Sequence, residues 1–142
     1  IHLDINQMTY SVQSAIEQAQ QLSQSYQLQN IEIEAVLLAA LNEDESIYKR
    51  TLERANIDTE ILKDKYEQKL KQYSVVKGDN VQYGQYISPK LNELFIKADK
   101  IKEEMQDDYM SMEHILKAIL TFLFFNFIAP FFAGLLLIDF FL

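Results

Sequence analysis

The chain carries an internal repeat in which residues 9–41 align without a gap on residues 88–120, at an offset of 79 positions. Apolar positions agree in phase between the two copies, whereas the positions between them differ. The apolar positions recur every three or four residues, which is the spacing of the buried face of an α-helix. The repeat therefore predicts a duplicated helical unit. The matched apolar pairs include Val12 and Leu91, Ile16 and Phe95, Ala19 and Ala98, Leu22 and Ile101, and Leu37 and Leu116.

Length and charge limit the class of protein. A chain of 142 residues can form one domain with a substantial core but is short for two. The net charge of -8 disfavours nucleic acid as a partner, because phosphate backbones would be repelled. No cysteine is present, which excludes disulfides and thiol catalysis and fits a reducing compartment. We therefore expect a cytoplasmic protein.

Four helices are predicted in the first copy. The first covers residues 9–25 with Thr9 as its N-cap, and the second is a short apolar helix around residues 34–41. Two more are expected over residues 46–55 and 58–73, where an aspartate supplies the cap of the second. The fourth helix has an amphipathic pattern, so we expect its charged residues to be solvated.

The second copy follows a linker over residues 74–87, which contains two glycines and loses helical periodicity. Ser88 and Pro89 then supply an N-cap and a first helical residue, a combination typical of helix starts. Ser111 is expected to cap the next helix, which carries the apolar residues up to Leu120. Only two helices of the second copy are therefore evident.

With the repeat laid out, several segments resemble the Clp N-terminal (Clp repeat) domain, and most closely that of ClpB-type protein disaggregases. The resemblance covers about residues 4–120 and follows the family in order and spacing. The linker segment favours the ClpB branch over the related Clp protease ATPases. The segments are DINQMTYSVQSAI (residues 4–16), IEIEAVLLAALNE (31–43), LERANID (52–58), GQYISPKLN (84–92) and MSMEHILKAIL (110–120).

The resemblance implies an all-α fold built as a pseudo-twofold pair of four-helix repeats, in agreement with the offset of 79 residues. On this basis we divide the chain into a first helical repeat at 4–73, a linker at 74–87, a partial second repeat at 88–120 and an apolar tail at 121–142. Counterparts of the third and fourth helices should follow Leu120. The tail does not look like them, so the second repeat is expected to be incomplete.

No enzyme chemistry is predicted for this chain. Its three glycines cannot supply a G-x-x-x-x-G-K-[ST] phosphate loop, and no cofactor is expected. The resemblance implies that whole family proteins carry two ATPase modules downstream and form hexamers only through them. His2 and His114 lack the spacing of a metal site, and Glu113 beside His114 is best explained as a structural pair at a helix start.

The resemblance also implies a polar substrate-binding set, which falls on Thr9, Asp107 and Glu113, all of the matching residue type. A structural explanation has equal weight. Thr9 is a helix cap, and carboxylates beside a helix start stabilise its free amides whether or not a ligand binds.

A neighbouring apolar groove of the family falls on Lys97, Ile101 and His114. Only Ile101 keeps the expected apolar character, since leucine is common at the other two positions. We expect this substitution to weaken or retune the binding of exposed apolar segments.

The tail differs in composition from the rest of the chain. Residues 122–142 contain eight Phe, five Leu and two Ile without one Lys or Arg. A helix of that length would reach about 31 Å, which matches the apolar core of a bilayer. We favour an aberrant end, such as a shifted reading frame, over a membrane anchor and over a replacement core helix.

These observations together predict a non-catalytic domain that recognises exposed segments of unfolded or aggregated polypeptides for a ClpB-like disaggregase. The first alternative is a domain that docks an adaptor protein onto a Clp protease ATPase. The second is a tail-anchored membrane protein, which requires residues 122–142 to be a genuine anchor.

Overall fold

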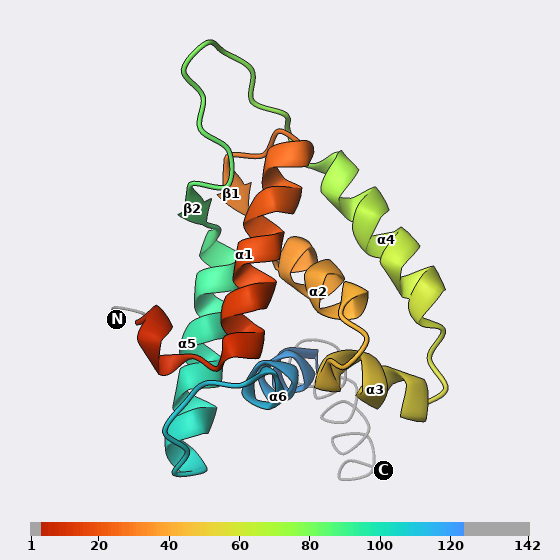
Figure 1. Ribbon diagram of the computed structural model, residues 1–142, viewed down its shortest axis with the longest axis vertical. Helices are drawn as coiled ribbons and strands as arrows, with labels where there is room; N and C mark the ends of the chain where they lie inside the picture. The colour runs from red at the N-terminus through yellow and green to blue at the C-terminus, as the bar shows by residue number, and fades with distance from the viewer. Residues whose placement is uncertain (1–3, 124–142) are drawn as a thin grey trace, which may run out of the picture.

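The computed structural model describes residues 4–123 of the chain and consists mainly of helices (Figure 1). The predicted helix bounds are confirmed to within one or two residues, except that the last helix ends at Leu123, three residues beyond the predicted Leu120. Thr9, Asp58 and Ser88 cap their helices as predicted. The predicted tail lies outside the described residues from position 124 onward. The first repeat contains α1 (Tyr10–Ser25), α2 (Ile33–Asn42), α3 (Ile47–Arg54) and α4 (Thr59–Gln72), and the second contains α5 (Pro89–Glu104) and α6 (Met112–Leu123).

Side-chain caps begin most of these helices. The hydroxyl of Thr9 accepts from the amide of Val12 at the start of α1, and Ser88 accepts from Leu91 at the start of α5. Ser46 and Asp58 cap α3 and α4 in the same way. Each cap satisfies a backbone amide that has no partner within its helix, which fixes where the helix begins.

Both long helices end in the same way at equivalent positions. Gln27 follows α1 and Gln106 follows α5, with φ angles of 57° and 60°, in the left-handed region. The next amide in each copy donates back to the last turn, from Leu28 to Ser23 at 2.8 Å and from Asp107 to Lys102 at 3.1 Å. This is the Schellman arrangement. The offset of 79 residues therefore holds in backbone geometry as well as in sequence.

Two short parallel pairings join the copies, and the sequence pattern did not predict them. β1 (Asn30–Ile31) pairs with β2 (Tyr86–Ile87), and an isolated bridge links Met8 with Met110. The repeat offset carries Met8 onto Ile87 and Ile31 onto Met110, so one pairing is the pseudo-twofold equivalent of the other. Each copy thus donates the strand that precedes its first helix to the strand that precedes the second helix of the other copy.

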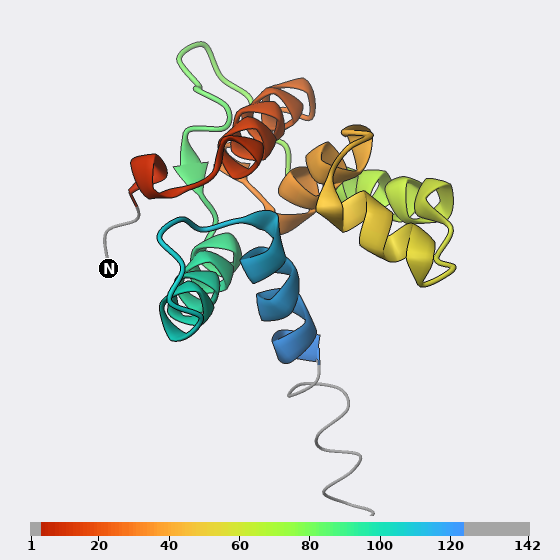
Figure 2. The same cartoon turned by 60° about the horizontal axis from the view of Figure 1, so that its bottom comes forward.

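The core lies between the helix pairs of the two repeats. α1 packs on α2, α5 packs on α6, and α4 covers the far side of α2, while α3 contacts both α2 and α6. Figure 2 shows the α5 and α6 pair beside the group formed by α2, α3 and α4. The largest fully buried apolar side chains belong to both repeats, as expected for one continuous core. They are Val12, Val36, Leu41, Leu70, Leu91, Phe95 and Ile115.

Gly84 is the one described glycine with a positive φ, at 65°. A Cβ atom at this position would lie 2.9 Å from the backbone oxygen of Gln20. The linker therefore passes close to α1 because residue 84 has no side chain, and the Gln20 amide also donates to the Gly84 carbonyl at 3.1 Å. This contact positions the linker so that β2, which follows it, pairs with β1 in the observed register.

Three buried or half-buried tyrosines join α3 to α4 and the end of α4 to α2 within the first repeat. The Tyr48 and Tyr66 hydroxyls are hydrogen-bonded to each other, and the Tyr73 hydroxyl donates to the Glu34 carboxylate at 3.0 Å. Burial raises the pKa of all three phenols above the ordinary value of 10.0, and the charge of Glu34 adds to the increase at Tyr73. The folded state therefore binds these phenolic protons more tightly than the unfolded state does.

We expect this arrangement to make the domain sensitive to alkali. Because the folded pKa values lie above the unfolded ones, the stabilisation is complete below pH 10.0 and is lost as pH rises through the folded values. Tyrosinate absorbance should show a late component that coincides with the loss of helical circular dichroism. Ionisation of every tyrosine in a chain that stays helical would contradict this expectation.

Candidate functional site

The candidate functional site lies where the start of the first repeat meets the second. The Thr9 amide donates to the Met110 carbonyl at 2.9 Å, and the Met110 amide donates to the Gln7 carbonyl at 2.8 Å. A single-turn 3₁₀ helix, η1 (Ile5–Gln7), leads into this junction. The N-terminus of α1 is therefore fixed beside the segment that connects α5 to α6.

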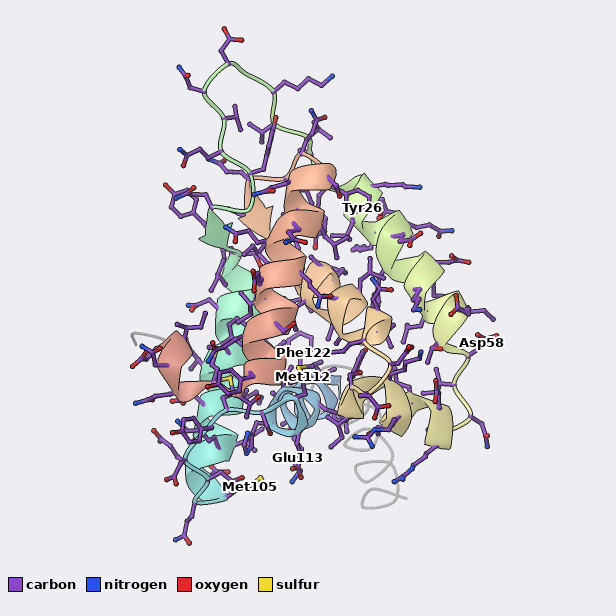
Figure 3. All side chains as sticks on the ribbon, viewed as in Figure 1. Tyr26, Asp58, Met105, Met112, Glu113 and Phe122 are labelled. Carbon is purple, nitrogen blue, oxygen red and sulfur yellow. The ribbon has the colours of Figure 1, made fainter. Side chains whose placement is uncertain are left out.

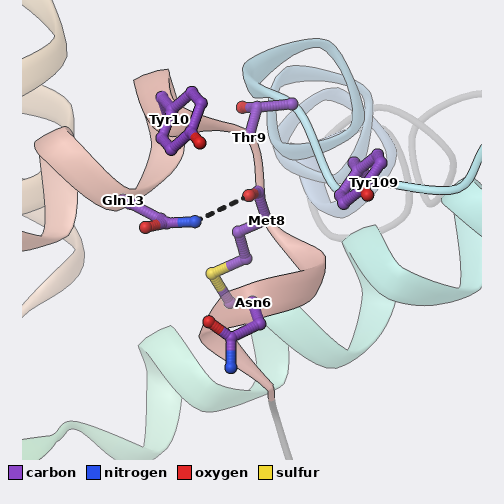
Figure 4. A pocket seen from close by; sticks show the side chains of 6 residues that line it. All are labelled: Asn6, Met8, Thr9, Tyr10, Gln13 and Tyr109. Atoms are coloured by element: carbon purple, nitrogen blue, oxygen red, sulfur yellow. Dashed lines mark hydrogen bonds between the residues drawn. The ribbon is translucent and has the colours of Figure 1, made fainter.

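A surface hollow of about 440 Å³ opens at this junction. Two tyrosines stand on either side of Thr9, and their side chains are largely in solvent, with Tyr10 89% exposed and Tyr109 56% exposed (Figure 4). The Gln13 amide donates to the Met8 carbonyl at 2.9 Å and to Ile5 at 3.0 Å, which holds the chain before α1 in place. We call this surface the inter-repeat hollow; it is lined by Asn6, Met8, Thr9, Tyr10, Gln13 and Tyr109.

Of the three predicted polar residues, only Thr9 lines the inter-repeat hollow. Asp107 and Glu113 lie in the segment that pairs with the residues before α1 through Met110. Glu113 is exposed at the start of α6 and forms an ion pair with Lys117 at 3.3 Å (Figure 3). Thr9 also caps α1, as expected from the sequence. Their capping and ion-pairing contacts are consistent with either the structural or the binding explanation.

The three predicted groove residues occupy different environments. His114 is buried, with 2% of its side chain exposed, and Ile101 packs against the core. Lys97 is half-buried on α5. Because His114 is inside the protein, it cannot itself present a surface to a bound segment, and the inter-repeat hollow is lined by none of the three.

The partner of His114 differs from the one that the sequence suggested. Its Nε2 atom lies 2.8 Å from the Asp107 carboxylate, whereas the neighbouring Glu113 carboxylate pairs with Lys117. The prediction that Glu113 and His114 form a pair with each other is therefore wrong. Adjacent residues on a helix point in different directions, so Glu113 faces solvent and His114 faces the core.

Sequence reasoning missed most of the hollow, including both tyrosines. One signal was available, because Tyr10 falls outside the apolar stripe of α1 and Tyr109 stands in a polar turn, so neither is needed for the core. Tyr10 and Tyr109, which form the aromatic rim of the hollow, also belong to one end of the pseudo-twofold axis. The repeat offset places Pro89 and Asn30 at the positions equivalent to Tyr10 and Tyr109.

The other end of the pseudo-twofold axis has a different chemistry. Burial raises the pKa of Glu32, and the charge of Glu34 adds to the increase, while a hydrogen bond with Ser88 and the charge of Lys90 lower it. The Tyr73 hydroxyl covers Glu34 at this end. The two ends are thus alike in backbone and unlike in the groups that they offer to a ligand.

Neither a metal-binding cluster nor a membrane-spanning helix occurs in the part of the chain that the structure describes. Among residues 4–123, no three histidine, aspartate or glutamate side chains gather in a way that could hold a metal ion. Within that range no helix has the length and apolar character needed to cross a bilayer.

Known proteins resemble this chain over most of its length. The family model described as the Clp repeat (R) N-terminal domain matches residues 7–122. The Chaperone protein ClpB of Staphylococcus aureus (strain COL) is 60% identical over 116 residues, which cover 82% of this chain and 13% of that protein. The chain therefore spans about an eighth of the length of this relative.

Two solved structures show the same fold. The N-domain of ClpV from Vibrio cholerae superposes with a TM-score of 0.72 at 22% identity, over 85% of this chain and 73% of that one. A complex of the ClpV N-domain with a VipB peptide has a TM-score of 0.66 at 21% identity, over 85% of this chain and 74% of that one.

Proposed function

Because this chain belongs to the Clp repeat N-terminal domain family, we propose that it is the non-catalytic substrate-recognition domain of a ClpB-like disaggregase. It captures exposed segments of unfolded or aggregated polypeptides and delivers them to ATPase modules elsewhere in the full protein. The observation that carries this proposal is the inter-repeat hollow, with two solvent-exposed tyrosines at the junction of the repeats.

The chemistry of the hollow suits an exposed peptide segment. Tyrosine offers a large apolar ring and a polar hydroxyl, and it loses little side-chain entropy when it binds. Thr9 and Gln13 add hydrogen-bonding groups between the rings. A segment with one or two apolar side chains can therefore bury them against the tyrosines while its backbone bonds to polar groups.

The negative charge near Tyr109 limits which polypeptide segments are expected to bind well. Exposed carboxylates precede Tyr109 in the chain: Glu103 and Glu104 end α5, and Asp107 and Asp108 lie in the segment between α5 and α6. We therefore expect segments that combine apolar and basic residues to bind more tightly than acidic ones, since opposite charges attract and like charges raise the cost of association.

Binding is expected to be weak. Burying one large apolar side chain contributes about 1.5–3 kcal/mol, and ordering a flexible segment offsets part of that gain. A dissociation constant of about 1 μM or weaker follows, because 1 μM already requires about -8 kcal/mol. Weak and unselective capture fits a domain that must release its substrate to a downstream motor.

The test is a titration of the 142-residue chain with a reduced, permanently unfolded model protein, followed by fluorescence anisotropy. Saturable binding that declines with added salt is the expected result, with the same model protein in its native, oxidised form as the control. No binding to the unfolded form at protein concentrations up to about 1 mM, at which a dissociation constant far weaker than 1 μM would still be detected, would exclude this function.

Adaptor docking is the second candidate, because a ClpV N-domain of the same fold forms a complex with a VipB peptide. An adaptor would present one defined segment, so it would bind with one stoichiometry and strong sequence dependence. Saturable binding of a folded adaptor by a chain that ignores unfolded proteins would favour this alternative.

A further inference from the structure

Asp107 occupies a position where an apolar residue is usual. It is the third residue beyond the end of α5, and its amide donates back to the Lys102 carbonyl. In the first copy the equivalent residue is Leu28, which is buried. An apolar contact at this point commonly accompanies the Schellman turn. The second copy therefore replaces an apolar turn contact with a carboxylate.

His114 provides a buried hydrogen-bond partner for the Asp107 carboxylate. Its Nε2 atom lies 2.8 Å from Oδ2 of Asp107, and the histidine side chain is 2% exposed while the aspartate side chain is 46% exposed. In the first copy the equivalent of His114 is Ala35. Among the residues that the structure describes, His114 makes the only side-chain hydrogen bond to Asp107, through Oδ2, so Oδ1 can accept from solvent or from a bound segment.

The second ring nitrogen of His114 fixes the orientation of the ring. The Ser111 amide donates to Nδ1 at 2.9 Å, and the Ser111 hydroxyl lies 3.1 Å from the same atom. Nδ1 must therefore carry a lone pair, which assigns the hydrogen to Nε2, where it faces Asp107. His114 is the third residue of α6 and takes the part that Glu or Gln plays in a capping box.

We propose that His114 is a positioning residue, which orients Asp107 so that its carboxylate faces a bound segment beside Tyr109. This inference rests on the proposed function, because it assigns a role to Asp107 in binding. His114 acts through Asp107 and does not touch the segment. A buried donor that holds one carboxylate oxygen leaves the other in a fixed direction, which lowers the entropy lost on binding.

The polar pair also needs an explanation other than stability. Burying an imidazole costs free energy unless both nitrogens are hydrogen-bonded, so the buried ring of His114 requires its bonds to Ser111 and Asp107, whereas apolar residues require none. The first copy has leucine and alanine at the equivalent positions. The pair therefore adds a directed carboxylate at one end of the molecule that the other end lacks.

A histidine variant that keeps the helix cap separates positioning from stability. In His114→Gln the side-chain oxygen can accept from the Ser111 amide, as Gln does in a capping box, but the same side chain cannot also reach Asp107 in the native geometry. We expect the thermal unfolding midpoint to stay close to that of the wild type. Affinity for the reduced model protein should fall by about tenfold, the effect of one charge-assisted contact.

The dependence on Asp107 is tested by a double-mutant cycle with Asp107→Ala. If His114 acts through Asp107, His114→Gln has no further effect on affinity once Asp107 is alanine. Nitrogen-15 spectra of the wild-type histidine should also show the hydrogen on Nε2. A variant that binds as tightly as the wild type, an effect that persists without Asp107, or a hydrogen on Nδ1 would each overturn the inference.

Failure of the proposed function has a different signature. A wild-type chain that does not bind the unfolded protein excludes substrate capture, whereas a wild-type chain that binds, with His114→Gln unchanged, rejects only the positioning role. The control is Lys102→Gln, which removes an ion pair with Asp99 on the same helix and leaves Asp107 and His114 in place.

Discussion

Replacing Phe95 with alanine is expected to lower the free energy of unfolding by about 3–5 kcal/mol, the cost of deleting a buried aromatic ring and leaving a cavity. Phe95 lies on α5 and its exposed fraction is 0%. It packs in the cluster that joins the two repeats, so nothing nearby can collapse into the space without moving a helix. Small domains are commonly stable by about 5–15 kcal/mol, which makes this a large fraction of the total.

Urea unfolding followed by circular dichroism measures the change in the free energy of unfolding. Phe95→Leu should cost much less, about 1 kcal/mol, because leucine fills most of the volume. Ile61→Ala, at an exposed position on α4, is the surface control and should change stability by about 0.5 kcal/mol or less. A change of under about 1 kcal/mol in Phe95→Ala would show that α5 does not carry the shared core.

Removing both rim tyrosines, in the double variant Tyr10→Ala and Tyr109→Ala, is expected to abolish measurable binding of the unfolded model protein. Each ring buried on binding contributes about 1.5–3 kcal/mol, so losing one weakens affinity by about ten- to a hundredfold. Stability should change little, because both side chains are largely in solvent in the free protein. The measurement is the anisotropy titration used for the wild type.

Tyr86→Ala is the matched control for this prediction. Tyr86 is 60% exposed but lies in β2, at the other pairing between the repeats, and does not line the inter-repeat hollow. Equal losses of affinity in the control and in the double variant would indicate nonspecific adhesion to exposed aromatic rings. Unchanged affinity in the double variant would remove the hollow from the proposed function.

The helices were predictable because their signals are local. The apolar period of α1 and α5 and the capping types at Thr9, Asp58 and Ser88 each act within a few residues of the chain. The repeat offset then predicted that α5 and α6 would pack as α1 and α2 do. Helical repeats keep their phase because the buried face must stay apolar in both copies.

The candidate site was predicted only in part. Thr9 was found because a resemblance to a known family pointed to it, and it does line the inter-repeat hollow. Tyr10 and Tyr109 were missed, since nothing in a sequence shows that two residues about a hundred positions apart flank the same hollow. His114 was placed on a binding surface because its position matched a surface leucine, but its ring lies inside the protein.

The sequence by itself determined the helical class, the helix bounds and the duplication, since these follow from spacing and from short-range capping chemistry. Only the tertiary structure decided that Met8 pairs with Met110, that His114 holds Asp107, and that an aromatic hollow opens at one end of the axis and not at the other. The physical reason is that these contacts form through space. They depend on how two nearly symmetric units close on each other, and a few side chains then make the two ends chemically different.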